Sequence, residues 1–516
     1  MITSNFYKIG IALLFLCFVG IYTFFDYRGM SYVTLLVFVS IVGGYMAINI
    51  GANDVANNVG PAVGSKALTL LAAVIIAAIF EAGGALIAGG DVVSTIKKGI
   101  IDPQLIADTS VFIWIMLAAL LGGALWLNLA TAFGAPVSTT HSIVGGVMGA
   151  GIAATGWEIV NWATMGKIAA SWVISPVLGG LMAALFLYII QHSIFHKEET
   201  LEAAKKVVPI LIGLMTFVFI SYLAIKGIKK LIKIDLPTAF MIGGVFAITT
   251  YLFVKPLILK ASQKISNNKD DINQLFTIPL IFAAALLSFA HGANDVANSI
   301  GPVAAIYEAL QTGVIASKAV IPIWVMVIGA LGIAVGLATY GPKLIKTVGS
   351  EITDLDQSRA WSIAMSSAIV VIIASWLGLP VSSTHIAIGG VFGVGYLRYY
   401  LYQKYEDEIE GVKAHHIKCL NKKIAKWTKK LPTLTDETEI KYFQSKIAVK
   451  ELKLQNMELA KIDFSKKERK QLEKIEKRQY VRKDLLVKII TAWLITVPAS
   501  ALIAATLFFV FRGIWG

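Results

Sequence analysis

Eleven apolar stretches, each close to or above the length that crosses a lipid bilayer, limit what this chain can fold into. They occupy residues 9–25, 32–50, 67–90, 111–131, 162–190, 207–225, 237–254, 275–291, 314–338, 359–379 and 486–511. A helix of ~20 apolar residues crosses the hydrocarbon core. Within lipid, only helices or closed barrels satisfy their backbone hydrogen bonds. The stretches therefore predict an all-α fold, a polytopic membrane helical bundle.

The composition agrees with a membrane location. Of the 516 residues, 56% are hydrophobic and 15% are charged, whereas soluble domains are ~45–50% apolar. The first stretch is predicted to be retained as a helix and not removed as a signal peptide, because the polar turn at 26–28 follows it and no small-residue cleavage site does. The two cysteines, Cys17 and Cys419, provide no disulfide or metal framework.

The segment GANDVAN occurs twice, from Gly51 and again from Gly292. A second pair of related segments follows, PVSTTHSIVGGVMGAG from Pro136 and PVSSTHIAIGGVFGVG from Pro380. The two offsets, 241 and 244 residues, are nearly equal, which indicates duplication of a whole multi-helix unit. We predict an additional N-terminal transmembrane helix at 1–31, repeat 1 at 32–190, connecting helices and loops at 191–274, repeat 2 at 275–396, a basic cytoplasmic insertion at 397–485 and a final transmembrane helix at 486–516.

Loop charge predicts that the two repeats are inverted. The lysine-rich loops 255–276 and 397–485 both belong in the cytoplasm by the positive-inside rule, so an even number of crossings separates them. This requires the Pro380 segment to supply one crossing and, by duplication, the Pro136 segment as well. The bundle then has about 12–13 spans, including discontinuous or re-entrant helices. The lysines of the loop 226–235 would lie outside, against the rule.

Most of the net charge of +14 lies in the insertion. Over 398–484, Lys and Arg outnumber Asp and Glu by 23 to 14. The helix-forming composition of 435–483 predicts a solvated cytoplasmic helical hairpin that is broken near Phe464. Contact of its basic residues with anionic lipid headgroups is the alternative. No nucleic acid is expected as a partner, because acidic residues are interleaved and aromatic residues are sparse.

Each GANDVAN copy places an Asp among apolar residues. A charged Asp near the centre of a span costs roughly 2.5–3.5 kcal/mol, so it needs a partner, and no Lys or Arg recurs beside both copies. The Asn residues that do recur would add amide oxygens to the carboxylates, a hard ligand set that suits sodium. An Asp that caps a helix, with Asn joining neighbouring helices, is the structural alternative. The predicted cation ligands are Asn53, Asp54, Asn57, Asn294, Asp295 and Asn298.

The second pair of motifs places hydroxyl clusters where Gly-rich helices begin. A helix N-terminus presents free N–H groups and the positive end of its dipole, which together with hydroxyls favour a small oxyanion. Ordinary helix capping is the simpler alternative. The recurring His141 and His385 are packing residues or ligands, and both readings stay open. The predicted substrate-binding residues are Ser138, Thr139, Thr140, Ser382, Ser383 and Thr384.

These four motifs, in this order, resemble those of the inorganic phosphate transporter family, PiT. The resemblance covers approximately 32–190 and 275–396. It implies a transport domain built from an inverted repeat that moves phosphate with sodium or protons, with phosphate between the two hydroxyl clusters and cations near the two Asp-Asn sets. The chain departs from the commoner layout of the family in its additional first helix and in the large insertion before the last span, which leaves its regulation open.

We therefore expect a multi-pass protein of the cell membrane that takes up inorganic phosphate by cation symport. Sodium is favoured over protons because proton relays usually lack so many neutral oxygen ligands. Transport of sulfate or a related tetrahedral oxyanion is the main alternative, and an anion channel is less favoured because buried carboxylates beside an oxyanion site suit coupled binding. The lipid bilayer is the expected surrounding, and assembly as a homodimer is left open.

We do not expect an enzyme, since the sequence shows neither a metal cluster nor a nucleophile with its base. The segment GPAVGSK at 60–66 only superficially matches a nucleotide-binding loop, because it is one residue short between the glycines and no strand precedes it. No cofactor is expected beyond the coupling ions.

Overall fold

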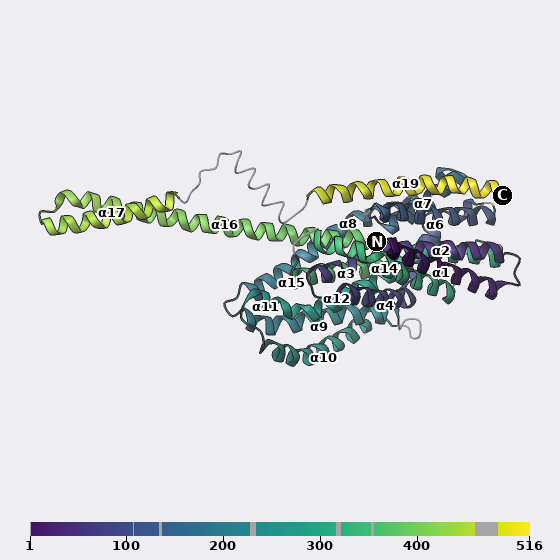
Figure 1. Ribbon diagram of the computed structural model, residues 1–516, viewed down its shortest axis with the longest axis horizontal. Coiled ribbons are helices and arrows are strands. Elements are labelled where there is room, and N and C mark those ends of the chain that lie inside the picture. Colours follow the sequence, from purple (N-terminus) through teal and green to yellow (C-terminus); the bar gives the residue numbers. More distant parts are fainter. Residues whose placement is uncertain are drawn as a thin grey trace. The chain divides into compact units, whose positions relative to one another are not determined.

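Every regular element of the protein that the structure describes is helical (Figure 1). The computed structural model describes residues 2–106, 108–133, 137–227, 234–315, 321–351, 355–459 and 483–515. Within these ranges, the sole β-type pairing is an isolated bridge between Ile101 and Val160. The described chain forms two units, Met1–Val394 with Arg482–Gly516 and, separately, Gly395–Val481. The predicted all-α class is confirmed.

The described residues up to Ser262 form ten α-helices. They are α1 (Ile2–Tyr27), α2 (Val33–Asn53), α3 (Val55–Gly64), α4 (Leu70–Ala88), α5 (Gly90–Lys98), α6 (Thr109–Ala132), α7 (Thr139–Thr155), α8 (Trp162–Ile190), α9 (Thr200–Lys226) and α10 (Leu236–Ser262). The second half contributes α11 (Lys269–Asn273), α12 (Thr277–Asp295), α13 (Ala297–Thr312), α14 (Ile323–Glu351), α15 (Gln357–Trp376), α16 (Ser383–Lys430), α17 (Glu437–Leu459) and α19 (Lys483–Trp515).

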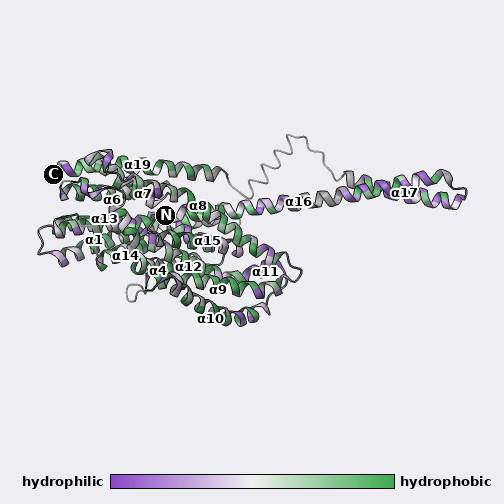
Figure 2. Ribbon diagram, turned by 180° about the vertical axis from the view of Figure 1, so that it is seen from behind, coloured by the Kyte–Doolittle hydropathy of each residue, from purple (hydrophilic) through white to green (hydrophobic). Residues whose placement is uncertain are grey.

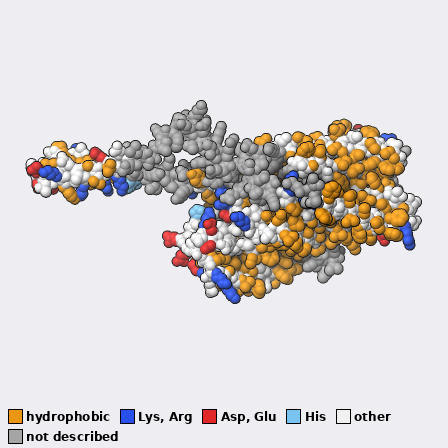
Figure 3. Space-filling model, viewed as in Figure 1, with side chains coloured by type: hydrophobic (Ala, Val, Ile, Leu, Met, Phe, Trp, Pro, Cys, Tyr) orange, Lys and Arg blue, Asp and Glu red, His pale blue; other side chains and the backbone are white. Residues whose placement is uncertain are grey.

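Eleven helical segments among the described residues are long and apolar enough to cross a membrane. Their outward faces are apolar as well: Leu71 is 71% exposed, Phe253 70% and Leu494 73%. Figure 2 shows the hydrophobic colour along the helices of the first unit, and Figure 3 shows largely hydrophobic atoms on the visible face of that unit. A surface of this kind is suited to lipid, so the chain is a multi-pass membrane protein, as predicted.

The predicted span at 314–338 is wrong at its start. Helix α13 ends at Thr312, and the next residue, Gly313, has a φ of 69°, in the left-handed region that favours glycine. Helix α14 then begins at Ile323, directly after Pro322, and continues to Glu351. Proline is favoured at helix starts because it has no N–H to satisfy. The predicted span began at 314 because the residues after Gly313 are mostly apolar, although the helix itself begins at Ile323.

Two long helices are interrupted at equivalent positions, as the predicted discontinuous helices require. Asp54 separates α2 from α3, and Val296, which follows Asp295, separates α12 from α13. Both interruptions are mild, because the backbone angles stay helical: φ −89° and ψ −35° at Asp54, and φ −56° and ψ −32° at Val296. Further along, Pro61 and Pro302 lie inside α3 and α13. Each proline removes the helical hydrogen-bond donor for the carbonyl group four residues earlier.

The first helix of each repeat packs closely against the second helix of the other repeat. Glycine makes this approach feasible, because a methyl group added at any of four glycines would lie about 2 Å from a carbonyl oxygen of the facing helix. The four pairs are Gly51 with Ile333, Gly336 with Ile48, Gly84 with Phe289, and Gly292 with Glu81. The α2–α14 and α12–α4 contacts are therefore reciprocal.

Helix α19 packs against α7 in the same way as α8 packs against α16. Gly389 and Gly393 of α16 lie against Pro176 and Gly180 of α8, while Gly145 and Gly149 of α7 lie against Val497 and Ala501 of α19. These matched contacts make α19 the counterpart of α8. They favour extending the second repeat beyond its predicted end at 396, so that the insertion interrupts this repeat.

Hydrogen bonds near the helix ends support the predicted inversion. Thr109 at the start of α6 donates to the carbonyl of Gly313 after α13 (2.9 Å), and Gln357 at the start of α15 donates to that of Ser65 after α3 (3.1 Å). Between the end of α3 and the start of α6, the described chain contains one candidate membrane span, α4. A single crossing by α4 would put the ends of α3 and α13, which are equivalent in the repeats, on opposite sides of the membrane, so the inversion stays a prediction.

The second unit contains the end of α16 followed by α17, which together form a helical hairpin. The chain turns in the short helix Leu431–Thr433, and aromatic residues join the two arms, with the Trp427 and Phe443 ring centres 6.4 Å apart. This turn precedes the predicted hairpin over 435–483. The predicted break near Phe464, Pro136 of the second motif and residues 228–233 of the lysine-rich loop all lie outside the described residues.

Candidate substrate and cation site

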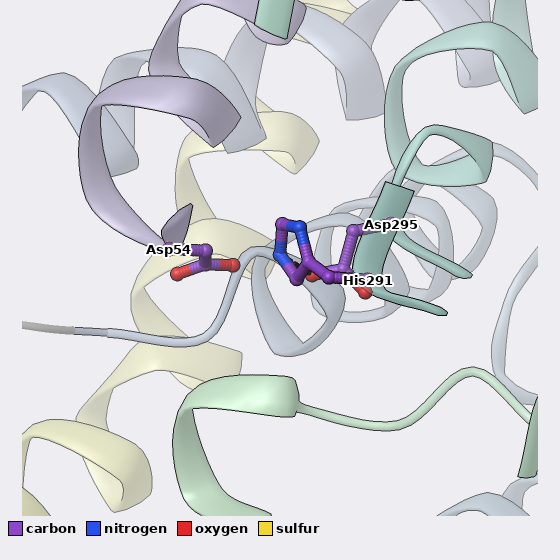
Figure 4. Close-up of side chains that lie close together, drawn as sticks. All are labelled: Asp54, His291 and Asp295. Carbon is purple, nitrogen blue, oxygen red and sulfur yellow. Dashed lines mark ion pairs between the residues drawn. The ribbon is translucent and has the colours of Figure 1, made fainter. Parts of the chain in front are cut away.

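Four helix ends meet in the interior of the first unit. Asp54 lies between α2 and α3, Asp295 ends α12, Thr139 begins α7 and Ser383 begins α16. All four residues are at most 1% exposed. Figure 4 shows Asp54 and Asp295 on either side of the His291 ring. The structure thus brings both repeated motifs of both halves into one buried region.

One hydroxyl group contacts both aspartates. Thr139 Oγ1 lies 2.7 Å from Asp54 Oδ2 and 3.3 Å from Asp295 Oδ2. A threonine hydroxyl carries a single hydrogen, so it donates to only one carboxylate at a time. The other contact brings two acceptor oxygens together, which is unfavourable in a buried site unless a cation or a proton lies between them.

The second repeat contributes a matching hydroxyl to Asp54. Thr384 Oγ1 donates to Asp54 Oδ1 (3.1 Å) and accepts from Asn57 Nδ2 (2.8 Å). On the opposite side, Asn298 Nδ2 donates to Thr139 Oγ1 (3.1 Å) and lies 3.2 Å from Thr140 Oγ1. Each Asn amide therefore binds the hydroxyl cluster of the other repeat, so the two predicted subsites share their residues.

Several oxygen atoms of this region have no hydrogen-bond partner among the described residues. They are Asn57 Oδ1, Asn298 Oδ1 and Asp295 Oδ1, all buried. Pro61 and Pro302 additionally remove the helical donors for the carbonyl groups of Asn57 and Asn298. Buried acceptors without donors are costly, and amide, carbonyl and carboxylate oxygens are the ligands of hard cations. These atoms fit sodium.

The starts of α7 and α16 provide hydrogen-bond donors in the same region. The intrahelical ladder of α7 starts where Ser142 N–H donates to Ser138 O (3.1 Å), and that of α16 starts where Ile386 N–H donates to Ser382 O (3.1 Å). The N–H groups of the first residues precede these ladders and point out of the helix ends. Together with the helix dipoles, they favour an anion.

The serines that precede the two helices act as N-caps. Ser138 Oγ accepts from His141 N–H (3.1 Å), and Ser382 Oγ accepts from His385 N–H (3.2 Å). Their oxygens are thereby directed at the protein backbone. Thr140 likewise donates to the carbonyl of Val381 (2.9 Å), so it joins the start of α7 to the segment before α16. Among the predicted hydroxyls, Thr139, Ser383 and Thr384 are the ones that face the aspartates.

Asn53 and Asn294 make different contacts from the other predicted cation ligands. Asn53 Nδ2 donates to Thr131 Oγ1 (2.8 Å), and its Oδ1 accepts from Val137 N–H (3.2 Å). Asn294 Nδ2 donates to Ser375 Oγ (2.9 Å) and to the carbonyl of Leu379 (3.3 Å). Both side chains thus hold the segments that lead into α7 and α16.

Two buried ionisable residues, Glu81 and His291, extend the site beyond Asp295. His291 Nε2 lies 2.9 Å from Asp295 Oδ2, and His291 Nδ1 lies 2.7 Å from Glu81 Oε2. Asn58 Nδ2 donates to Glu81 Oε1 (2.7 Å). The sequence analysis missed this chain of contacts. Two features of the sequence could have revealed it. Glu81 is the one acidic residue in the apolar stretch 67–90, and His291 stands immediately before the second GANDVAN.

The two aspartates are therefore chemically different. In the contact between α4 and α12, Glu81 faces Gly292, whereas Ile333 faces Gly51 at the equivalent place between α14 and α2. His291 comes directly before Gly292, and Ile50 has the equivalent position before Gly51. Both isoleucines are fully buried. Asp295 thus has an imidazole within hydrogen-bond distance, whereas the corresponding neighbours of Asp54 are apolar.

The recurring histidines lie behind the hydroxyls and contact aromatic rings. The His141 and His385 ring centres are 4.5 Å apart, His141 contacts Trp172, and His385 stacks on Trp493. Trp172 Nε1 also donates to the carbonyl of Pro380 (3.3 Å). This arrangement favours the packing interpretation, in which the ring cluster joins the starts of α7 and α16.

Known proteins with similar sequences and structures were compared with this chain. The sequence profile of the Phosphate transporter family matches residues 50–504. A Helicobacter pylori protein described as a "Putative phosphate permease" is 48% identical over 97% of this chain and 94% of its own length. A Haemophilus influenzae protein with the same description is 36% identical over 78% of this chain and 94% of its own length.

A solved structure titled "The sodium-dependent phosphate transporter" is also similar. The TM-score is 0.73 and the sequence identity is 32%. The match covers 93% of this chain and 100% of the solved chain. The similarity therefore includes both repeats and the site between them.

The Glu81–His291 contact can be tested by a double-mutant cycle. We expect His291→Gln and Glu81→Gln each to lower the melting temperature of the purified protein, because removing one partner of a buried pair typically costs about 3–5 kcal/mol. The double variant should lose less than the sum of the two single losses, since residues in contact couple by about 0.5–3 kcal/mol. Fully additive losses would show that the two side chains do not stabilise each other.

Proposed function

This chain belongs to the phosphate transporter family, and we propose that it takes up inorganic phosphate across the cell membrane by symport with sodium. The observation that carries the proposal is that two buried carboxylates and two helix N-termini occupy one site. The N-termini and hydroxyls suit an oxyanion, while the carboxylates repel it. An effective dielectric of about 20 gives like charges 4 Å apart a repulsion of about 4 kcal/mol.

Cation binding resolves this conflict. A cation held by Asp54 or Asp295 neutralises a carboxylate and leaves the helix N-termini free to bind the anion. The substrate then binds well only after the cation has bound, and such a dependence couples the two movements thermodynamically. Transport is thus driven by an ion gradient and requires no catalysis.

Sodium is favoured by the ligand types. The unpartnered oxygens of Asn57, Asn298 and Asp295 form the kind of neutral and anionic oxygen set that binds hard cations. A proton needs only a carboxylate or an imidazole. The similar solved structure is titled as sodium-dependent, which agrees with this choice. The His291–Glu81 contact next to Asp295 is the feature that would serve a proton-coupled mechanism.

Phosphate is favoured over sulfate by the same carboxylates. Near neutral pH phosphate carries at least one O–H group, whereas sulfate has only acceptor oxygens. Asp54 and Asp295 lie within hydrogen-bond distance of the hydroxyls that we assign to the substrate, so a carboxylate oxygen beside the bound anion can accept this hydrogen bond. Once a cation satisfies the carboxylates, the hydroxyls of Thr139, Ser383 and Thr384 are released to donate to the other phosphate oxygens, together with the first N–H groups of α7 and α16.

Uptake into proteoliposomes tests the proposed function. We expect purified protein to accumulate radiolabelled phosphate when an inward sodium gradient is imposed, with little inhibition by excess sulfate. A matched choline gradient and protein-free liposomes serve as controls. Phosphate leakage without accumulation would indicate a channel, and accumulation that follows a pH gradient in sodium-free buffer would indicate proton coupling.

The hydroxyl donors are tested by replacing one from each repeat. Thr139→Ala combined with Thr384→Ala should raise the apparent KM for phosphate at least tenfold, because a hydrogen bond to a charged partner contributes about 1.5–3 kcal/mol and each tenfold change is about 1.4 kcal/mol. Thr155→Ala is the matched control, since this threonine lies at the other end of α7 and donates to Gly151 O (3.4 Å). An unchanged KM in the double variant would leave both threonines as structural residues.

A further inference from the structure

A cavity lies outside the site described above, between α1, α2, α6 and α14. Its volume is about 620 Å³. None of the predicted site residues lines it, and none of its fifteen described lining residues is acidic. The principal polar lining residues are Lys8, Lys343, Tyr45, Tyr340, Asn49 and Thr131.

Lys8 and Lys343 are the charged residues among the described residues that line this cavity. Lys8 is the first charged residue of the apolar helix α1, and Lys343 lies in the last third of α14. A concave surface with charges of one sign and no lining carboxylate attracts anions more strongly than isolated surface charges do. Lysine is a common binder of phosphate groups, which it contacts as a compact charge.

Neutral polar groups of the lining suit an oxyanion with several acceptor atoms. The hydroxyl groups of Tyr45 and Tyr340 are able to donate hydrogen bonds. Asn49 and Asn128 are already joined by a weak contact of 3.4 Å, and Asn49 also donates to the carbonyl of Tyr45 (2.9 Å). These contacts hold the polar wall of the cavity in place without a charged group.

The opposite wall is apolar and continues onto the outer surface. Ile9, Ala12, Leu13 and Leu16 of α1 line it, and Ile9 and Leu13 are 50% and 55% exposed. The volume lies within the range of ~300–1,000 Å³ that is typical of pockets for organic ligands, and it exceeds the needs of a bare phosphate ion. A phosphate group with an apolar substituent would fit both walls.

The cavity also adjoins the substrate site. Thr131 lines the cavity, and its Oγ1 accepts a hydrogen bond from Asn53, the neighbour of Asp54 (2.8 Å). Ala52 lines the cavity as well. An inorganic phosphate ion that moves to or from the substrate site is therefore a second source of the same chemical group.

We propose that this cavity is a binding site for a phosphate group, with Lys8 and Lys343 as its charged ligands. The apolar wall and the volume favour the headgroup of an anionic phospholipid, whose chains follow α1. The inorganic phosphate source rests on the proposed transport function, whereas the phospholipid source does not. The two sources are separated by experiment.

The test compares Lys8→Gln/Lys343→Gln with wild type and with Lys260→Gln. Lys260 is an exposed lysine near the end of α10 that does not line the cavity. Binding of phosphatidylglycerol to the full-length protein is measured by native mass spectrometry. Binding of radiolabelled inorganic phosphate is measured at equilibrium in a Thr139→Ala/Thr384→Ala background, where the substrate site is impaired.

We expect the double lysine variant to bind phosphatidylglycerol at least tenfold more weakly than wild type, with Lys260→Gln unchanged. Unchanged lipid binding together with loss of inorganic phosphate binding in the threonine background would assign the cavity to the ion instead. If both ligands bind the double lysine variant as they bind wild type, the proposal is wrong and the lysines only extend toward the membrane surface. Lys8→Arg/Lys343→Arg must retain binding, which separates lost charge from lost folding.

Discussion

The hydroxyl of Thr139 lies between two buried carboxylates, and the rest of the site is arranged around this contact. Its single proton satisfies Asp54 or Asp295, but not both. The first N–H groups of α7 and α16 favour an anion in the same region. Opposite charges must therefore bind together for either to be stable at low dielectric. We propose that this requirement is what couples the movement of the anion to that of the cation.

The duplicated architecture brings the two carboxylates to the same hydroxyl. Glycines such as Gly51 and Gly292 allow the helices of the two repeats to approach to backbone contact. The interruptions of these helices then lie beside the hydroxyl clusters at the starts of α7 and α16. The repeats are not equivalent, however, because His291 and Glu81 replace isoleucines on the Asp295 side. This asymmetry makes Asp54 and Asp295 unequal ligands, although the motif around each is the same.

The sequence was sufficient to predict what is repeated. The aspartates and hydroxyls were found because they recur at equal offsets, and the apolar stretches predicted the all-α membrane bundle. Glu81 and His291 were missed because each occurs in one copy only, which a comparison of repeats overlooks. The contacts of Asn53 and Asn294 with the segments before α7 and α16 depend on tertiary packing. The pairing of α19 with α7 was likewise hidden by the insertion that separates α19 from its repeat.

The central claim is that cations on the two aspartates enable the anion to bind. The most direct test is equilibrium binding of phosphate to the purified protein at increasing sodium concentration, in wild type, Asp54→Asn and Asp295→Asn. The account predicts that sodium raises the phosphate affinity of wild type at least tenfold and that each variant loses most of this effect. Phosphate affinity that is the same with and without sodium in wild type would contradict it.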